Sequence, residues 1–134
     1  ENFIYVAKYF SKKKKVPVFF LGPSEKEWLS VIKKSVPNSL FPEWGKFQKK
    51  NIKGPAFVIA LSERIHCALA NDSGTAHMID AGGAPIIKVF GRSFPGKYTG
   101  LTPGSITIDS RIFGSSDINK ITPKYVIKKI EEIF

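Results

Sequence analysis

The chain has 134 residues, of which 43% are hydrophobic and 13% aromatic, so it is long enough to bury a core and too apolar to be disordered. Its 21 basic against 11 acidic residues give a net charge of +10, which raises the question of a nucleic-acid or anionic-membrane partner. Only three of the basic residues are arginines and no usual nucleic-acid motif is present, so we expect no nucleic-acid partner.

The first third of the chain alternates between predicted helix and strand. Residues 2–13 carry apolar side chains near helical spacing, and the lysine run 12–15 ends that helix. The apolar run 16–21 predicts a strand of a parallel sheet covered on both faces. Ser24 with Glu27 three residues later has the capping-box spacing and predicts the start of a second helix.

The lysine run 12–15 has two interpretations. A solvated turn explains it most simply, and contact with anionic lipid, at about 1 kcal/mol per lysine, is the alternative. No apolar stretch reaches the roughly 18 residues of a membrane-spanning helix, no signal peptide is visible, and Cys67 is the single cysteine. We therefore expect a cytoplasmic protein whose membrane contact, if any, is peripheral, at the inner face of the cytoplasmic membrane.

The rest of the chain continues the alternation. After an irregular region in which residues 39–41 suggest a short strand, the pattern predicts helices at 57–65, 73–81 and from Thr122 onward, and strands at 67–70, 85–90 and 105–108. The Gly- and Pro-rich segment 91–104 is expected to be an ordered loop over the sheet edge. This order predicts an α/β fold, a Rossmann-like doubly wound parallel sheet forming a single domain over residues 1–134, with ligand at the carboxyl ends of the strands.

A tight turn between a strand and a helix is the most informative part of the chain. It is the run Asn71–His77, in which Asp72 or Ser73 can cap the helix and Gly74 lets the backbone approach a ligand closely. The amides of Gly74–Ala76 would point out of the positive end of the helix. The turn therefore predicts an anion site suited to a diphosphate.

The ordered motifs resemble those of glycosyltransferase family 9, the ADP-heptose lipopolysaccharide heptosyltransferases. The shared run is Asn-Asp-Ser-Gly with His77 just after, then a small-residue helix, Pro85, an apolar strand and Phe90–Gly91. The segment from Val16 through Gly22 to Glu27 also resembles the family's strand, Gly turn and acidic helix start, so the resemblance covers nearly the whole chain. It implies the carboxyl-terminal, donor-binding half of a GT-B glycosyltransferase.

Several of these residues have both a structural and a functional interpretation. Asp72 suits capping or a sugar hydroxyl better than a phosphate, which a carboxylate repels, and Asp80, three residues beyond His77, can orient that imidazole. In the family an acidic residue near Glu25 binds the ribose, although Glu25 and Glu27 also suit the first turn of any helix.

Two residues depart from the family pattern. Arg92 stands where the family more often has proline, and it is either neutral or pairs with phosphate. Lys88 interrupts an apolar strand, for which exposure at an edge or a snorkelling side chain is the simplest explanation. Together, the motif and the resemblance predict these donor-contacting residues: Gly22, Glu25, Asp72, Ser73, Gly74, Thr75, His77, Gly91 and Arg92.

The function implied by the resemblance is transfer of a sugar, expected to be heptose, from a nucleoside diphosphate sugar such as ADP-heptose to a lipid-linked, lipopolysaccharide-type acceptor. The family's acceptor site and catalytic carboxylate belong to an amino-terminal domain that has no counterpart here, and Met78 is the only methionine, so we expect a fragment without turnover of its own and without catalytic residues. No cofactor or metal is expected. The alternative is a non-catalytic Rossmann-like binding module that has lost the donor.

Overall fold

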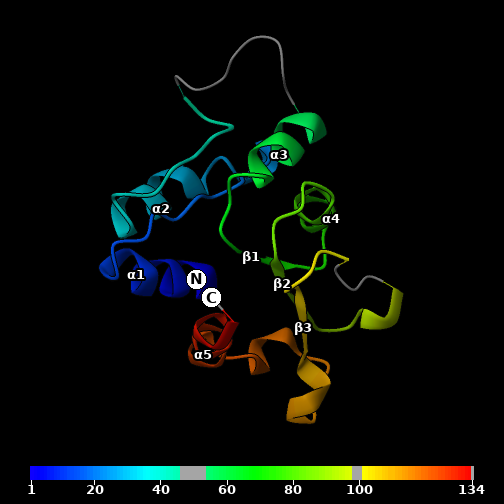
Figure 1. Ribbon diagram of the computed structural model, residues 1–134. Helices are drawn as coiled ribbons and strands as arrows, with labels where there is room; N and C mark the ends of the chain where they lie inside the picture. Colours follow the sequence, from blue (N-terminus) through cyan, green and yellow to red (C-terminus); the bar gives the residue numbers. More distant parts are fainter. Residues whose placement is uncertain (46–53, 98–100, 134) are drawn as a thin grey trace. The chain divides into compact units, whose positions relative to one another are not determined.

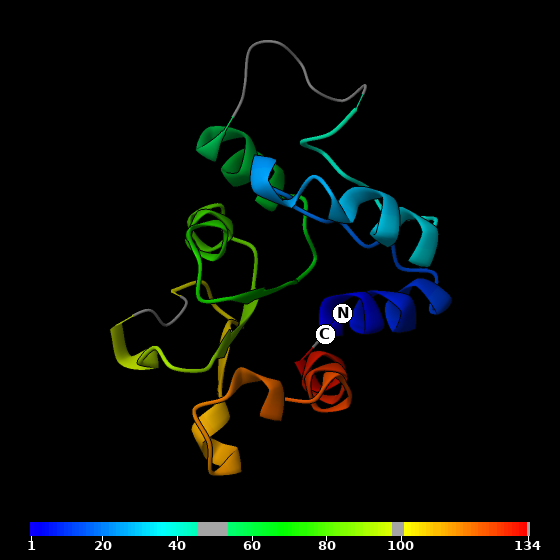
Figure 2. The ribbon, with the colours of Figure 1, turned by 180° about the vertical axis from the view of Figure 1, so that it is seen from behind.

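The computed structural model describes residues 1–45, 54–97 and 101–133, and its contacts divide the chain into two compact units, Glu1–Ile52 and Lys53–Phe134. Each unit has its own elements, which Figures 1 and 2 show from opposite sides. The two units are described separately below.

The first unit contains two helices that pack against each other. Helix α1 covers Asn2–Lys12, as the periodicity predicted, and α2 covers Trp28–Ser35. Each contributes one buried aliphatic side chain, Val6 from α1 and Ile32 from α2. Each helix therefore turns one apolar face inward, as the spacing of its apolar residues predicts.

The predicted strand at 16–21 is wrong as a continuous strand. Among the described residues of this unit a single parallel bridge forms, between Val18 and Leu40, through hydrogen bonds from Phe19 N to Leu40 O and from Leu40 N to Pro17 O, each 2.9 Å. Pro17 has no N–H to donate, and the partner segment lies between Pro37 and Pro42, which have none either. The pairing is therefore limited to a single residue, at the position where a short strand 39–41 was predicted.

The predicted capping box of Ser24 and Glu27 is also wrong, because the box lies two residues earlier. A short 3-10 helix covers Pro23–Glu25, and the carboxylate of Glu25 accepts a hydrogen bond of 2.9 Å from Gly22 N. Proline at the first helical position favours this earlier start, since its fixed φ already suits the turn. Helix α2 follows separately and begins at Trp28.

The second unit is an α/β layer structure. Its elements in chain order are α3 (Pro55–Ser62), β1 (Ala68–Asn71), α4 (Gly74–Ala81), β2 (Ile86–Phe90), β3 (Ile106–Asp109) and α5 (Pro123–Ile133). Within the described residues the three strands form one parallel sheet in the order β1-β2-β3, as predicted, with Asn71 beside Val89 and Phe90 beside Asp109. The fold class predicted from the alternation is confirmed.

Helices lie on both sides of this sheet. Helix α4 packs against β1 and β2, and α5 lies on the opposite side of the strands in both views (Figures 1 and 2). All five residues of β2 are buried, as its central place in the sheet requires, and they include Lys88, which interrupts the apolar run. Helix α3 packs against α4 at Gly82, where a Cβ would lie 2.5 Å from Ser62 Cβ, so glycine is required there by close helix packing.

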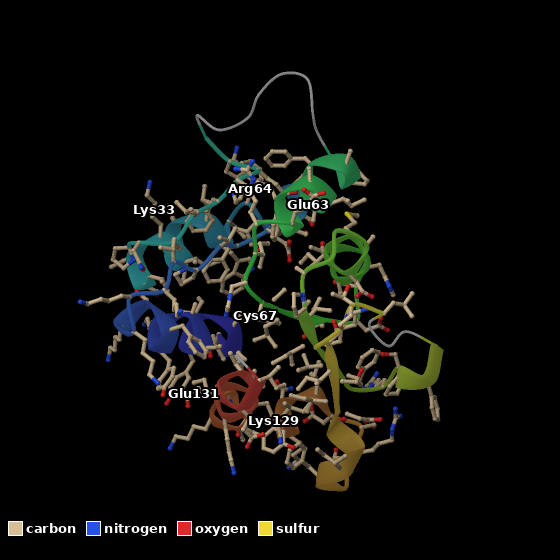
Figure 3. All side chains as sticks on the ribbon, in the orientation of Figure 1. Lys33, Glu63, Arg64, Cys67, Lys129 and Glu131 are labelled. Carbon is tan, nitrogen blue, oxygen red and sulfur yellow. The ribbon has the colours of Figure 1, made fainter. Side chains whose placement is uncertain are left out.

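Helix α5 closes the unit. It begins at Pro123 as predicted, and Thr122 Oγ1 accepts a hydrogen bond of 3.3 Å from Tyr125 N at its first turn. The aliphatic residues Val126, Ile127 and Ile130 are buried along one face. On another face, Lys129, labelled in Figure 3, lies 2.6 Å from Glu132. The predicted link 91–104 contains a short 3-10 helix at 95–97, and its residues 98–100 lie outside the described residues.

Candidate functional site

A pocket of about 590 Å³ opens at the carboxyl end of the sheet in the second unit. Strands β1 and β2 are parallel, so the residues that follow them meet at one edge. The residues that line the pocket are Asn71, Asp72, Val89, Gly91, Arg92, Ser93, Ser115, Ser116, Asp117 and Ile118. Seven of the ten side chains are polar or charged and none is aromatic, so the pocket suits a polar ligand.

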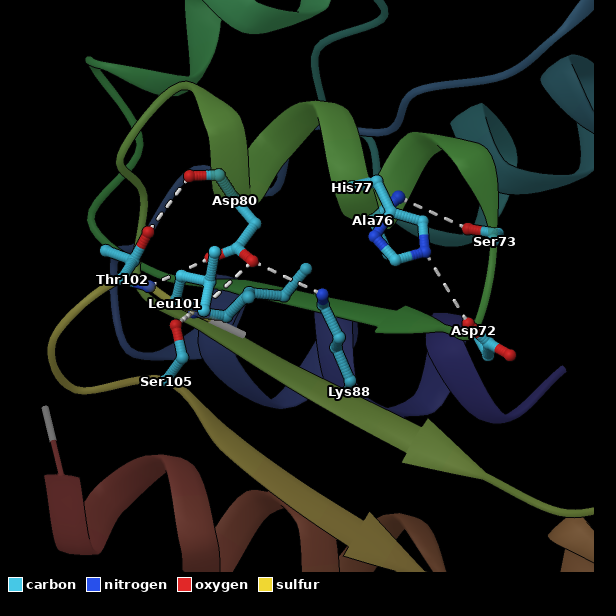
Figure 4. A network of polar contacts seen from close by, with 10 residues as sticks. Asp72, Ser73, Ala76, His77, Asp80, Lys88, Leu101, Thr102 and Ser105 are labelled. Atoms are coloured by element: carbon cyan, nitrogen blue, oxygen red, sulfur yellow. Dashed lines mark hydrogen bonds and ion pairs between the residues drawn. The ribbon is translucent and has the colours of Figure 1, made fainter. Parts of the chain in front are cut away.

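The turn after β1 places the start of α4 next to this pocket. Ser73 is the N-cap, and its hydroxyl accepts a hydrogen bond of 3.3 Å from Ala76 N (Figure 4). Of the two capping residues that the sequence allowed, the cap is therefore Ser73. Among the described residues no group accepts a hydrogen bond from the backbone amides of Gly74 or Thr75. These amides, at the positive end of α4, can serve an anion.

Gly74 has space around it. A Cβ at this position would meet only the Met78 methyl group, at 4.0 Å, and its φ is not in the left-handed region. The fold of the described residues therefore does not require glycine at position 74. The open space at this position is compatible with a close approach by a ligand.

Asp72, which needs no capping role, lies beside the imidazole of His77. The distance from His77 Nε2 to Asp72 Oδ1 is 3.8 Å, and 21% of the Asp72 side chain and 47% of the His77 side chain are exposed (Figure 4). The expectation that Asp80 orients His77 is wrong, because Asp80 is bound elsewhere, as shown below. Asp72 and His77 thus form the polar pair next to the cap of α4.

The turn after β2 packs tightly against residues 116–118, which also line the pocket. A Cβ at Gly91 would lie 3.1 Å from Ile118 Cβ, 3.1 Å from Ser116 O and 3.2 Å from Ile118 N. Glycine at position 91 therefore allows the close approach of residues 116–118, and two of the three atoms that a Cβ would meet belong to the backbone. This packing brings the 115–118 segment, which no sequence motif marked, into the pocket.

Arg111 fixes the same turn from another side. Its Nη2 donates a hydrogen bond of 2.9 Å to Ser93 O, and its guanidinium carbon lies 4.4 Å from the centre of the Phe94 ring. Asp109 holds the arginine in place, accepting from Arg111 Nε at 3.0 Å and from its backbone N at 2.9 Å. Arg92, the single cationic residue among the described residues that line the pocket, precedes this anchored stretch directly.

A buried ion pair supports α4 from the sheet. Lys88, in the central strand β2, is 1% exposed, and its Nζ lies 3.4 Å from Asp80 Oδ2 (Figure 4). Asp80 also accepts hydrogen bonds from the backbone amides of Leu101, at 3.0 Å, and Thr102, at 3.1 Å. The expectation of an exposed or snorkelling Lys88 is therefore wrong, because a carboxylate across the layer pairs with its charge.

The ionisation of Asp80 follows from these contacts. Burial opposes the charged form, but the hydrogen bonds from Leu101 and Thr102 and the charge of Lys88 outweigh it and hold the pKa of Asp80 below its ordinary value. The carboxylate thus stays ionised and joins α4, β2 and the segment after residue 100. This network holds the helix that carries Ser73 and His77 in position.

The predicted site residues divide between the two units. In the second unit, Asp72, Gly91 and Arg92 line the pocket, and Ser73, Gly74, Thr75 and His77 lie on the turn and on α4. Gly22 and Glu25 belong to the first unit, where they bind each other. The predicted site residues did not include Ser115, Ser116, Asp117 and Arg111. The one sequence feature that could have indicated them is their polarity in a Gly- and Ser-containing stretch that follows a predicted strand.

A further polar cluster surrounds Glu25 in the first unit. Burial raises the pKa of the Glu43 carboxyl, a hydrogen bond with the backbone of Leu21 opposes that rise, and the charge of Glu25 adds to it. The indole of Trp44 donates a hydrogen bond of 2.9 Å to Leu21 O, and Lys26 Nζ lies 5.6 Å from the centre of its ring. Glu43 was not among the predicted site residues.

Two further classes of site were searched for within the described residues. No three His, Cys, Asp or Glu side chains come together there in a way that could hold a metal ion. None of the helices in the described ranges combines the length and apolarity needed to cross a membrane.

The fold and the pocket define a class of protein. The parallel sheet with helices on both sides matches the carboxyl-terminal domains of GT-B glycosyltransferases, and the pocket lies at the carboxyl ends of the strands. The chain is therefore a glycosyltransferase-like domain.

Two solved structures make the resemblance specific. One is the glycosyl transferase family 9 protein from Veillonella parvula, which is 27% identical, with a TM-score of 0.73 over 99% of this chain. The other is the ADP-heptose lps heptosyltransferase II of E. coli, which is 16% identical, with a TM-score of 0.78 over 98% of this chain. The chain covers 40% of the length of each. No model of a protein family matches the sequence, and no curated protein matches it.

Proposed function

We propose that this chain binds the nucleoside diphosphate sugar donor of a glycosyltransferase, and that the diphosphate lies at the turn between β1 and α4. The observation that carries the proposal is the pocket, which is lined by Asp72 and Arg92, together with the start of α4, which follows Asp72 directly along the chain. The amides of Gly74 and Thr75 and the guanidinium of Arg92 are the positive groups that a diphosphate requires.

The chemistry that this arrangement supports is sugar transfer. Negative charge develops on the departing diphosphate as the glycosidic bond to the donor breaks, and preorganised amides and a guanidinium can stabilise that charge. Because these groups belong to the chain itself, we expect donor binding without a requirement for a divalent metal. Asp72, beside His77, is suited to accept a hydrogen bond from a sugar hydroxyl.

ADP-heptose is the donor we propose, and a lipid-linked, lipopolysaccharide-type saccharide is the acceptor. The name of the similar E. coli enzyme, ADP-heptose lps heptosyltransferase II, supports this choice of donor. The 27% sequence identity with the family 9 glycosyl transferase of Veillonella parvula supports it further. A protein acting on such an acceptor is expected to work at the inner face of the cytoplasmic membrane. The cluster of lysines at 12–15 is our candidate for contact with anionic lipid there.

Calorimetric titration of ADP, UDP, GDP and ADP-heptose into this chain, and into the full-length gene product, tests the proposal. We expect selective binding of ADP and ADP-heptose. Asp72→Ala and His77→Ala should weaken that binding by about tenfold each, the effect of one charge-assisted hydrogen bond. His66→Ala, which changes the other histidine, serves as the control and should bind as the wild type does.

Gly74→Ala gives the sharper test, because the fold leaves room for the added methyl group. We expect a variant of unchanged stability that has lost most of its affinity for ADP, since Cβ takes the space of a bound phosphate. Wild-type ADP affinity in Gly74→Ala would place the diphosphate elsewhere. If no nucleotide binds either protein, the chain is a binding module without a donor.

A further inference from the structure

One wall of the pocket is not used by the proposed diphosphate contacts. It consists of Ser115, Ser116, Asp117 and Ile118, which follow β3 and a short 3-10 helix and line the same pocket as Asp72. The wall therefore offers two serine hydroxyls and a carboxylate to a ligand bound beside Asp72.

The chemistry of this wall suits hydroxyl groups and opposes phosphate. A carboxylate accepts hydrogen bonds from two hydroxyls at once, and serine both donates and accepts. The described lining of the pocket contains two carboxylates, Asp72 and Asp117, and a single guanidinium, that of Arg92. If Arg92 binds the diphosphate, no cationic side chain in this lining is left to bind a second anion. The described lining also has no aromatic ring on which a nucleobase can stack.

The wall is held in a defined shape. Ser115 Oγ accepts a hydrogen bond of 3.0 Å from Asp117 N, and Asp117 Oδ1 accepts from Asn119 N at 3.0 Å and from Asn119 Nδ2 at 2.9 Å. The close approach of Gly91 fixes Ser116 and Ile118 from the other side. Asp117 Oδ2 accepts no hydrogen bond from a described residue, so a ligand can use it.

We infer that the 115–118 wall binds the hydroxyls of the transferred sugar, and that Asp117 determines which sugar is accepted. The inference rests on the proposed function, because it assumes that the diphosphate lies at the start of α4. The pocket then holds the diphosphate and the sugar, and the nucleobase is bound outside the 115–118 wall.

The test compares each nucleoside diphosphate with its sugar conjugate in the same protein. ADP, ADP-glucose and ADP-heptose are titrated into the full-length wild type and into Asp117→Asn, in which the amide oxygen can still accept from Asn119. We expect Asp117→Asn to bind the preferred ADP-sugar about tenfold more weakly, as for one lost hydrogen bond to a charged group, and to bind ADP as before. Ser116→Ala should show a smaller loss of the same kind.

Glu63→Gln is the matched control, since it makes the same chemical change at an exposed position, labelled in Figure 3, that does not line the pocket. Equal losses for ADP and ADP-sugar in Asp117→Asn, or no loss for either, would overturn the inference while leaving the proposed function intact. If the wild type binds neither ADP nor any ADP-sugar, and the UDP and GDP series fail too, the proposed function itself is refuted.

Discussion

The ammonium group of Lys88 lies 3.4 Å from the carboxylate of Asp80, with 1% of the lysine side chain and 9% of the aspartate side chain exposed. The pair joins the middle of the central strand to the helix whose first turn borders the pocket. A charge in that strand is tolerated only because its partner is fixed by two further backbone hydrogen bonds.

Loss of Asp80 should destabilise the second unit more than loss of Lys88. Asp80→Ala leaves a buried ammonium without its carboxylate, and we expect a loss of about 3–5 kcal/mol in the free energy of unfolding. Lys88→Met fills a similar volume and leaves Asp80 bound to Leu101 and Thr102, so its cost should be smaller. Urea denaturation measures both, and a larger loss in Lys88→Met would contradict this assignment.

The stability of the protein should fall in acid because of Asp80. Its pKa is lower in the folded than in the unfolded chain, so its contribution is complete above the unfolded value of about 3.9 and is lost as the pH falls through the lower folded value. Unfolding free energies measured between pH 7 and pH 2 should drop less steeply for Asp80→Asn than for the wild type. Parallel curves would show that other carboxylates dominate the acid transition.

Alanine at position 91 should be poorly tolerated. The added Cβ would lie 3.1–3.2 Å from atoms of Ser116 and Ile118, and we expect a destabilisation of about 1–3 kcal/mol together with a displaced pocket wall. Gly96→Ala is the control, because a Cβ there meets no atom within 4 Å. Thermal unfolding of the two variants makes the comparison. Equal midpoint temperatures would show that residues 115–118 can move to accommodate the added methyl group without loss of stability.

Removal of the α4 cap should cost stability and anion affinity together. Ser73→Ala loses the acceptor for Ala76 N, which is worth about 0.5–2 kcal/mol. Ser73→Asp keeps a cap acceptor but adds a negative charge beside the proposed phosphate site. We expect it to restore the unfolding free energy and to bind ADP more weakly than Ser73→Ala does. Equal ADP affinity in the two variants would argue against a phosphate at this helix end.

Arg111→Lys should loosen the turn at Ser93 although the charge is kept. Lysine cannot reproduce the fork that binds both Asp109 and Ser93 O, and it stacks less well on Phe94. We expect faster backbone amide exchange in residues 92–94 and an affinity for ADP that is several-fold lower. Arg64→Lys, at an exposed arginine, is the control and should leave both unchanged.

The sequence by itself predicted those parts of the second unit that local rules determine. The strand–turn–helix at 68–81, the strand Ile86–Phe90 and the start of α5 at Pro123 lie where their periodicity and capping residues place them, although the burial of Lys88 was not predicted. These features depend on hydrogen bonds within a few residues and on continuous apolar stretches. The same rules failed at 16–21, where three prolines limit pairing that the apolar run alone suggests.

Only the tertiary structure decided what faces the turn after Asp72. The second wall of the pocket, the anchoring of Ser93 by Arg111 and the pairing of Lys88 with Asp80 all join segments that are far apart along the chain or lie in different layers. No local pattern marks them, because the polarity of a serine or an aspartate is the same in a solvated loop and in a pocket wall. Packing of β3 beside β2 brings these residues together, and that is why the sequence could predict the turn between β1 and α4 but not the 115–118 wall of the pocket.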